Sequence, residues 1–258
     1  MQPLNPQFVT KFAQDPFEFE AAQRLRYDVF VKELGGDGPL VDHDRGLEID
    51  EFDPYFEHLL LYDVNKASEH SMGQVVGVYR ILPSQKADQI GRYYSETEYD
   101  LSRLKNDKRR LLELGRSCLH KDYRGGAAMF HLWQALSQYV LEQKVDVLFG
   151  TASFHGTDIA DLAPALSLLH HRYLAPEALR VQVREEHSLS MNIVPEDQIS
   201  ARQAMLKVPS LIKAYLRLGG YVGDGAFIDY AFNTVDVCLI VDIHAMNARQ
   251  KQIYTRKA

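Results

Sequence analysis

A glycine pair between an apolar strand and an apolar helix is the feature that most constrains the fold. LLELGRSCLH, at 111–120, has the character of a buried strand, and the turn KDYRGG follows it directly. After the turn, Leu132, Leu136 and Val140 recur at helical spacing. This order predicts a strand, a tight turn and a helix, which is the basic unit of folds that pack helices on a sheet.

Further elements are expected on both sides of this unit. The apolar and turn patterns predict strands at 57–63, 73–82, 145–153, 221–230 and 235–243, and helices at 16–34, 158–171 and 209–219. The runs 57–63 and 73–82 should pair antiparallel. The chain contains no internal repeat or long linker. We therefore expect one domain, 1–258, of the α+β (α/β) class, with a mixed, mostly antiparallel central sheet flanked by helices.

Composition excludes several classes of protein. The chain is 46% hydrophobic and carries a formal net charge of -6, which argues against nucleic-acid binding. No apolar run reaches the ~18 residues that cross a bilayer, and the polar start has no signal-peptide pattern. A cytoplasmic protein is expected. Cys118 and Cys238 lie in apolar stretches, so they should be buried thiols.

Two charges interrupt the strand 111–120. Residues three apart face opposite sides of a regular strand, so Glu113 and Arg116 share a site only if one extra residue is inserted, and Gly115 suits a bulge. Alternatively, one side chain faces solvent and the other belongs to a structural ion pair. Spacing alone leaves both interpretations open.

Basic residues gather on either side of this strand. Before it lie Arg103, Lys105, Lys108, Arg109 and Arg110; after it come Lys121, Arg124, Gly125 and Gly126. Backbone N–H groups at a glycine turn before a helix can hold a phosphate or a phosphopantetheine, although such a turn is more often only a connection. The first cluster is either a solvated loop or a docking surface.

Other polar residues are candidates only as members of a set. Arg26, Asp50, Asp53 and Arg80 lie on or beside apolar elements, where single charges are more often snorkelling stems or salt bridges. Ser153 and His155 follow the predicted strand 145–153, but no G-x-S-x-G elbow occurs and a polar loop is expected. No metal is expected, because His170 and His171 lack a carboxylate at ligand spacing.

The order of these segments is similar to that of a known superfamily. LRYDVFVKELG, EIDEFD, VGVYRIL and LELGRSC resemble the acyl-homoserine-lactone synthases and their relatives of the GNAT superfamily. The matching positions are Arg26, Phe30, Asp50, Asp53, Arg80, Glu113 and Arg116. RSCLHKDYRGG, GTASFHGTD and PSLIKAYLRLGGYVGDGAFIDYAFNTVDV extend the resemblance, over nearly the whole chain, to the ornithine acyl-ACP N-acyltransferases.

The resemblance implies a reaction and roles for residues. A (3-hydroxy)fatty acyl group would pass from acyl carrier protein to the α-amine of L-ornithine, the first step of ornithine-lipid synthesis. Glu113 would be the base, oriented by Arg116, and a backbone N–H near Gly115 would meet the oxyanion. Asp50 and Asp53 are candidates for the cationic end of ornithine.

The remaining candidates are implied in the same way. Arg26, Phe30 and Arg80 would shape the acceptor site or fix the ornithine carboxylate, and Ser153 and His155 would also contact substrate. Lys121, Arg124, Gly125, Gly126, Lys108, Arg109 and Arg110 would meet the carrier protein and its acyl-phosphopantetheine.

One departure from the superfamily and several alternatives remain. The superfamily's pantetheine loop usually begins with Gln or Arg, where this chain has Asp122, and an acid there favours the single phosphodiester of a carrier protein over coenzyme A. No permanently bound cofactor is expected, and the amphiphilic product implies peripheral membrane contact. The alternatives are a lactone synthase using S-adenosylmethionine and a non-catalytic acyl-binding relative.

Overall fold

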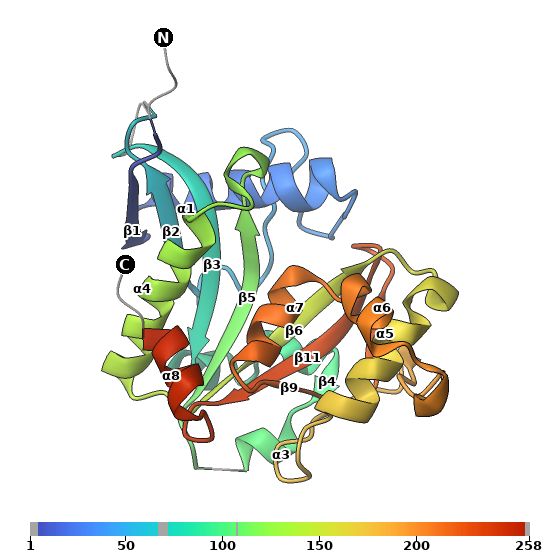
Figure 1. The fold of residues 1–258 in the computed structure, drawn as a ribbon. Helices are drawn as coiled ribbons and strands as arrows, with labels where there is room; N and C mark the ends of the chain where they lie inside the picture. The colour runs from blue at the N-terminus through green and yellow to red at the C-terminus, as the bar shows by residue number, and fades with distance from the viewer. Residues whose placement is uncertain (1–4, 67–71, 107, 256–258) are drawn as a thin grey trace. The chain divides into compact units, whose positions relative to one another are not determined.

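The computed structural model describes residues 5–66, 72–106 and 108–255 (Figure 1). The chain divides into two compact units. Unit 1 comprises Met1–Leu82, Leu114–Lys144 and Tyr254–Ala258, and unit 2 comprises Pro83–Glu113 and Val145–Ile253. That the whole chain is one domain stays a prediction.

The sheet of unit 1 confirms the predicted antiparallel pair. Its strands are β1 (Phe8–Phe12), β2 (Glu57–Asp63), β3 (Gln74–Pro83) and the second part of β5 (Leu111–Leu119). β2 pairs antiparallel with both β1 and β3. β5 lies next to β3 in the order of strands. The charged positions of β5 therefore enter the middle of a buried sheet.

Two long helices cover opposite faces of this sheet. Ala22 and Leu25 of α1 (Pro16–Arg26) belong to a buried cluster with Leu60 of β2. Leu132 of α4 (Ala128–Gln143) lies over Gly77, in the space that a β-carbon there would fill. That space also adjoins Leu61. Leu60 and Leu61 point to opposite faces of the strand, so α1 and α4 lie on opposite sides.

The first helix is not regular to its end. The sequence pattern predicts one helix over 16–34, but α1 ends at Arg26 and a π-helical stretch follows, Tyr27–Glu33. The N–H of Leu34 donates to the carbonyl of Val29, five residues back. Wider turns of this kind are rare and often occur at functional sites. Here the stretch begins directly after Arg26.

The strands of unit 2 are centred on two long ones. β6 (Val147–His155) pairs parallel with Leu111–Glu113 of β5 and antiparallel with β11 (Thr234–Asp242) along its whole length. β10 (Ala226–Asp229) and β9 (Tyr221–Val222) pair with β11, so the predicted strand 221–230 is interrupted. Gly225, with φ of +81°, lies at the break. β8 (Ser188–Leu189) pairs with β10.

Shorter elements complete the chain. β4 (Tyr99–Asp100) pairs with β7 (Gln182–Val183) in a separate two-stranded sheet. The helices are α2 (Ser84–Ile90), α3 (Ser102–Lys105), α5 (Ile159–Tyr173), α6 (Ala201–Lys207), α7 (Ser210–Arg217) and α8 (Ala248–Thr255). Single 3-10 turns occupy Tyr94–Thr97, Lys121–Tyr123 and Glu196–Gln198. In unit 2, α7 packs on β11 (Figure 1).

The predicted fold class is confirmed: mixed, mostly antiparallel sheet is flanked by helices. Cys118 and Cys238 are free, buried thiols, as expected. Burial raises the pKa of both thiols. In the ranges that the structure describes, no helix combines the length and the apolar character needed to span a bilayer.

Candidate active site

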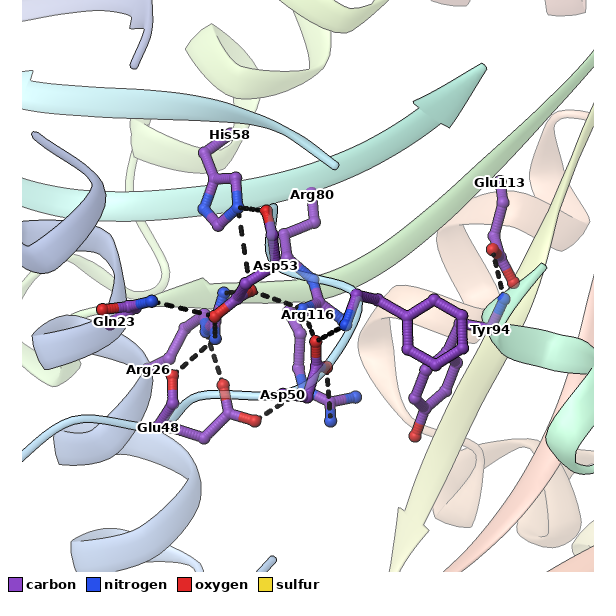
Figure 2. A network of polar contacts seen from close by, with 11 residues as sticks. Gln23, Arg26, Glu48, Asp50, Asp53, His58, Arg80, Tyr94, Glu113 and Arg116 are labelled. Atoms are coloured by element: carbon purple, nitrogen blue, oxygen red, sulfur yellow. Dashed lines mark hydrogen bonds and ion pairs between the residues drawn. The ribbon is translucent and has the colours of Figure 1, made fainter. Parts of the chain in front are cut away.

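Six charged side chains of unit 1 form a closed ring of ion pairs (Figure 2). Three guanidinium groups alternate with three carboxylates, and each group pairs with two neighbours of opposite charge. In order around the ring they are Arg26, Glu48, Arg116, Asp50, Arg80 and Asp53. The formal charges cancel. We call this set the ion-pair ring.

The buried half of the ring is centred on Asp53. Arg26 donates from Nη1 to Asp53 Oδ1 at 2.6 Å and from Nη2 to Oδ2 at 2.8 Å, and from Nε to Glu48 Oε2 at 2.5 Å. Arg80 Nη1 donates to Asp53 Oδ1 at 2.6 Å and to Asp50 Oδ1 at 2.7 Å. Both guanidinium groups are almost completely buried. A bidentate, buried pair of this kind has strict geometry.

Arg116 and Asp50 are the most exposed members of the ring. Arg116 Nε donates to Glu48 Oε1 at 3.1 Å, and its Nη2 lies 3.4 Å from Asp50 Oδ2. The Arg116 and Asp50 side chains are 14% and 17% exposed, more than any other member. Asp50 Oδ2 accepts no hydrogen bond from the described residues. The Arg116–Asp50 link is therefore the place where a ligand could meet the ring.

The ring shifts the titration of its members. Burial opposes ionisation of Asp53, but Arg26 and Arg80 outweigh it and hold its pKa well below the usual range. Glu48 behaves likewise, with Arg116 and Arg26 lowering its pKa against the effect of burial. His58, beside Asp53, has its pKa lowered to about 4 by burial and by the charge of Arg26. At neutral pH Asp53 and Glu48 are therefore ionised and His58 is neutral.

The sequence prediction missed one member of the ring. Glu48 is 1% exposed, in the loop before β2, and it joins Arg26 to Arg116. Its sequence context, GLEID, resembles an ordinary polar loop. One sequence signal could have indicated Glu48: the chain has three closely spaced acids, at 48, 50 and 53, and three arginines on apolar elements that need partners. The structure places Phe30 against the apolar core of α1 rather than in the ring.

The strand that carries Arg116 is distorted there, as a bulge requires. Arg116 has φ of +48°, in the left-handed region that side-chain-bearing residues rarely adopt. Gly115, Arg116 and Ser117 are partly exposed, whereas the rest of β5 is buried. A β-carbon on Gly115 would meet no atom within 4 Å. The sheet is thus open to a ligand beside Gly115.

Glu113 belongs to a different set of contacts, within unit 2. It is 1% exposed, and its carboxylate accepts hydrogen bonds from the backbone N–H groups of Tyr94 at 2.8 Å (Figure 2) and of Ser95 at 2.5 Å. These donors belong to the first turn of the 3-10 segment Tyr94–Thr97, whose free N–H groups favour an anion. The backbone therefore fixes the position of Glu113.

The glycine turn before α4 has fewer free charges than its sequence suggests. Arg124 donates to both Oε atoms of Glu33, at 2.5 and 2.8 Å, and to the carbonyl of Leu119. Lys121 and the two glycines are exposed, and Gly125 has φ of +76°. The backbone of the turn is accessible, but Arg124 already has an acidic partner.

The basic cluster before β5 is also partly neutralised. Lys105 pairs with Glu96 at 2.8 Å, and Arg109 pairs with Asp242 at the same distance. Lys108 and Arg110 are exposed.

One loop prediction was wrong. Ser153 and His155 do not follow a strand: both lie inside β6, which continues to His155 because β11 pairs with it along its full length. Ser153 pairs with Asp236, and His155 pairs with Thr234. Among the described residues no group of acids, histidines and cysteines has the arrangement of a metal site.

Comparison with known proteins places the chain in a family. Residues 25–134 match the model of the acetyltransferase (GNAT) domain. A protein of Rhodobacter capsulatus named L-ornithine N(alpha)-acyltransferase is 53% identical over 247 residues, which cover 96% of this chain and 94% of the relative. The chain belongs to this acyltransferase family. A Brucella abortus relative of the same name is 38% identical, covering 96% and 89%.

The family membership makes the chain an N-acyltransferase with a GNAT domain. The solved structure of the AHL synthase LasI has a similar fold, with a TM-score of 0.50 at 16% identity, covering 97% of this chain and 95% of that one. The predicted likeness to the lactone synthases is thereby confirmed at the level of the fold.

Proposed function

We propose that this protein transfers a 3-hydroxyacyl group from acyl carrier protein to the α-amine of L-ornithine, giving the N-acyl-ornithine from which an ornithine lipid is made. The observation that carries the proposal is near-full-length similarity, at 35–53% identity, to four proteins named L-ornithine N(alpha)-acyltransferase. The carrier-protein donor and the lipid product rest on the sequence resemblance.

Glu113 is the proposed general base. Only an uncharged amine can attack a thioester, so a proton must leave the substrate ammonium, and Glu113 accepts it directly or through a water. The nitrogen then bonds to the thioester carbon, the C–S bond breaks, and the carrier thiolate leaves and takes up the second proton that the nitrogen loses. The fixed N–H donors of Tyr94 and Ser95 keep the Glu113 carboxylate in one position.

The opening in β5 is the proposed oxyanion site. When the amine attacks, the carbonyl oxygen becomes negative and needs a preorganised donor. The backbone at Gly115 and Arg116 is partly exposed and departs from regular strand geometry, and space is free beside Gly115. Its N–H groups are the proposed donors. The ion-pair ring supports this role, because it fixes the side chain of Arg116.

The ring itself is assigned mainly a supporting role. Arg26 and Arg80 are too deeply buried to receive a substrate carboxylate without displacing Asp53. They therefore shape the loop that carries Glu48, Asp50 and Asp53. Asp50 Oδ2 accepts no hydrogen bond among the described residues, but it is buried and lies 3.4 Å from Arg116 Nη2.

The proposed donor fits the turn before α4. Asp122 is exposed there and Arg124 is paired with Glu33, so the turn presents backbone rather than free cations to a phosphate. That suits the single phosphodiester of a carrier-bound pantetheine. Lys108 and Arg110, with their exposed charge, are the proposed contact for an acidic carrier.

The test offers the purified protein two donors and two amines. 3-Hydroxyacyl carrier protein and 3-hydroxyacyl coenzyme A are each incubated with L-ornithine or S-adenosylmethionine, and products are measured by mass. We expect N-acyl-ornithine from the carrier-bound donor and no product from S-adenosylmethionine. Acyl-homoserine lactone would indicate a lactone synthase instead, and preferential use of coenzyme A would overturn the donor assignment.

A further inference from the structure

One face of the unit 2 sheet is polar although it is largely buried. The register pairs Asp236 with Ser153 and Thr234 with His155, and residues directly opposite in neighbouring strands share a face. Glu113 pairs with Phe149 of β6, whose side chain lies on the same side as that of Ser153. We call this surface the polar face. Val235 and Phe154 point to the other, apolar side.

The segment 93–99 crosses this face and contacts three strands in turn. The Tyr93 ring packs edge-on against Phe149 of β6, with centroids 5.0 Å apart. The N–H of Ser95 donates to Glu113 of β5. The Tyr99 hydroxyl lies 2.9 Å from the carbonyl of Asp236 in β11. Glu98, the residue before Tyr99, is thereby carried into the interior and is 3% exposed.

Three carboxylates are gathered in this part of the molecule. Glu98, Glu113 and Asp236 are 3%, 1% and 5% exposed. Burial raises the pKa of Tyr99, and Cys238, Glu98 and Asp236 raise it further. Burial likewise raises the pKa of Cys238, to which Glu98 and Glu113 add. Glu98 and Asp236 therefore both act electrostatically on Tyr99, and Glu98 and Glu113 both act on Cys238.

One hydroxyl group near Glu113 and another near Asp236 lack hydrogen-bond partners. Ser95, whose N–H binds Glu113, is fully buried, and Thr234, two residues before Asp236 on the same face, is 6% exposed. Neither Oγ of Ser95 nor Oγ1 of Thr234 makes a hydrogen bond within the ranges that the structure describes. Buried hydroxyl groups nearly always have a partner, so these two indicate a site for a ligand.

We propose that the polar face binds the side-chain ammonium of the amino-acid acceptor, with Asp236 and Glu98 as its carboxylate partners and the hydroxyl of Thr234 as a further acceptor. An ammonium has three donors and no acceptor, and a mixed set of carboxylate and hydroxyl oxygens satisfies it. Glu113, on the same face, would then meet the other amine of the same molecule.

The proposal rests on the proposed function and narrows it. It makes these residues the determinants of selectivity for an acceptor with two amines. It also selects the polar face over Asp50 as the partner of the side-chain ammonium. Asp50 Oδ1 already accepts from Arg80, and its Oδ2 lies 3.4 Å from Arg116, which carries the charge that an ammonium would carry.

The experiment compares L-ornithine with L-norvaline, which has the same carbon chain and no side-chain amine. The rate constant kcat/KM is measured for both acceptors with the wild-type protein, Asp236→Asn, Glu98→Gln, Thr234→Val and Asp50→Asn. Wild type should strongly prefer ornithine. Asp236→Asn and Glu98→Gln should each lower kcat/KM for ornithine by about 10²-fold, mostly through KM, and leave norvaline within about twofold. Thr234→Val should lower it less.

Controls separate binding from folding. Glu18→Gln alters a carboxylate of unit 1 that is equally buried and should leave the ratio of the two acceptors unchanged. If a polar-face variant does not fold, competition of ornithine and norvaline on wild type still decides, because equal use of both overturns the proposal. Equal losses for both acceptors in Asp236→Asn, or a selective loss in Asp50→Asn alone, would also overturn it. No ornithine product from wild type would instead reject the proposed function.

Discussion

Unit 1 and unit 2 both contain buried carboxylates, but they neutralise them differently. In unit 1 each carboxylate of the ion-pair ring has two guanidinium partners, and the charges cancel within the ring. In unit 2 Glu113 accepts from backbone N–H groups, and Glu98 and Asp236 lie near hydroxyl groups that have no partner among the described residues. The first arrangement is electrically neutral within itself, and the second contains hydroxyl groups without a partner among the described residues.

The difference indicates which carboxylates can do chemistry. A carboxylate held between two arginines has a strongly lowered pKa. It is a poor base, because the two cations lower its affinity for a proton. A carboxylate that accepts hydrogen bonds from backbone N–H groups, as Glu113 does, is held in a fixed position. We therefore expect substitutions in the ring to act mainly on stability and substitutions on the polar face to act mainly on turnover and acceptor choice.

The largest effect is expected at Glu113. Glu113→Gln keeps the size of the side chain and removes the proton acceptor, so kcat should fall by about 10² to 10⁴-fold. Steady-state kinetics measure the loss, and thermal unfolding checks that the variant folds. Turnover near that of wild type would remove Glu113 from the role of base. A loss that shrinks at high pH would show that Glu113 only assists deprotonation.

The next largest effect concerns the stability of unit 1. Arg26→Met leaves Glu48 and Asp53 buried with one partner fewer each, and breaking a buried ion pair costs about 3–5 kcal/mol. Urea denaturation measures the loss. The matched control is Arg24→Met on the same helix, whose exposed pair with Glu20 should contribute less than about 1 kcal/mol. Equal losses in the two variants would show that the ring does not stabilise the fold.

A third effect depends on pH. The pKa of His58 is about 4 when folded and near its usual value of 6.5 when unfolded. As pH falls through this window, the unfolded chain takes up a proton that the folded protein does not, so stability falls by up to about 3 kcal/mol. His58→Gln should flatten the dependence of unfolding free energy on pH between 6.5 and 4. An unchanged slope would show that His58 titrates normally in the folded protein.

The smallest effect is expected at the surface. Lys108→Glu with Arg110→Glu should raise KM for acyl carrier protein several-fold and weaken its salt dependence, because exposed charges act mainly on encounter. KM for ornithine should stay unchanged. KM for acyl carrier protein is also measured for a second double variant, Lys213→Glu with Arg217→Glu, which alters the basic pair on α7. If only the α7 pair alters KM for the carrier, docking occurs there and the cluster before β5 is a solvated loop.

The sequence predicted the elements better than the contacts between them. β2 was expected at 57–63 and is found there, because a short apolar run such as EHLLLYD is typical of a buried strand. The change from α-helix to π-helix after Arg26 was not predicted, since the apolar stripe continues through it. Local patterns determine element type and say little about such irregularities.

The site was predicted only in part for a similar reason. Arg26, Asp50, Asp53, Arg80 and Arg116 were named, and the structure joins them, but Glu48 was missed because a loop acid carries no periodic signal. Glu98 and Asp236 were also missed. Asp236 interrupts the apolar run TVDVCLIVD, and that interruption was the available signal. Pairing of distant strands, which no local pattern shows, brings Asp236 opposite Ser153.

The position of the new amide tests the central claim most directly. If the polar face holds the side-chain ammonium of ornithine while Glu113 deprotonates the α-amine, only the α-nitrogen receives the acyl group. The product made from L-ornithine and 3-hydroxyacyl carrier protein is fragmented in a mass spectrometer, which distinguishes α- from δ-linked acyl chains. The account predicts the α-linked product alone. Predominantly δ-linked product, or no acyl-ornithine at all, would contradict it.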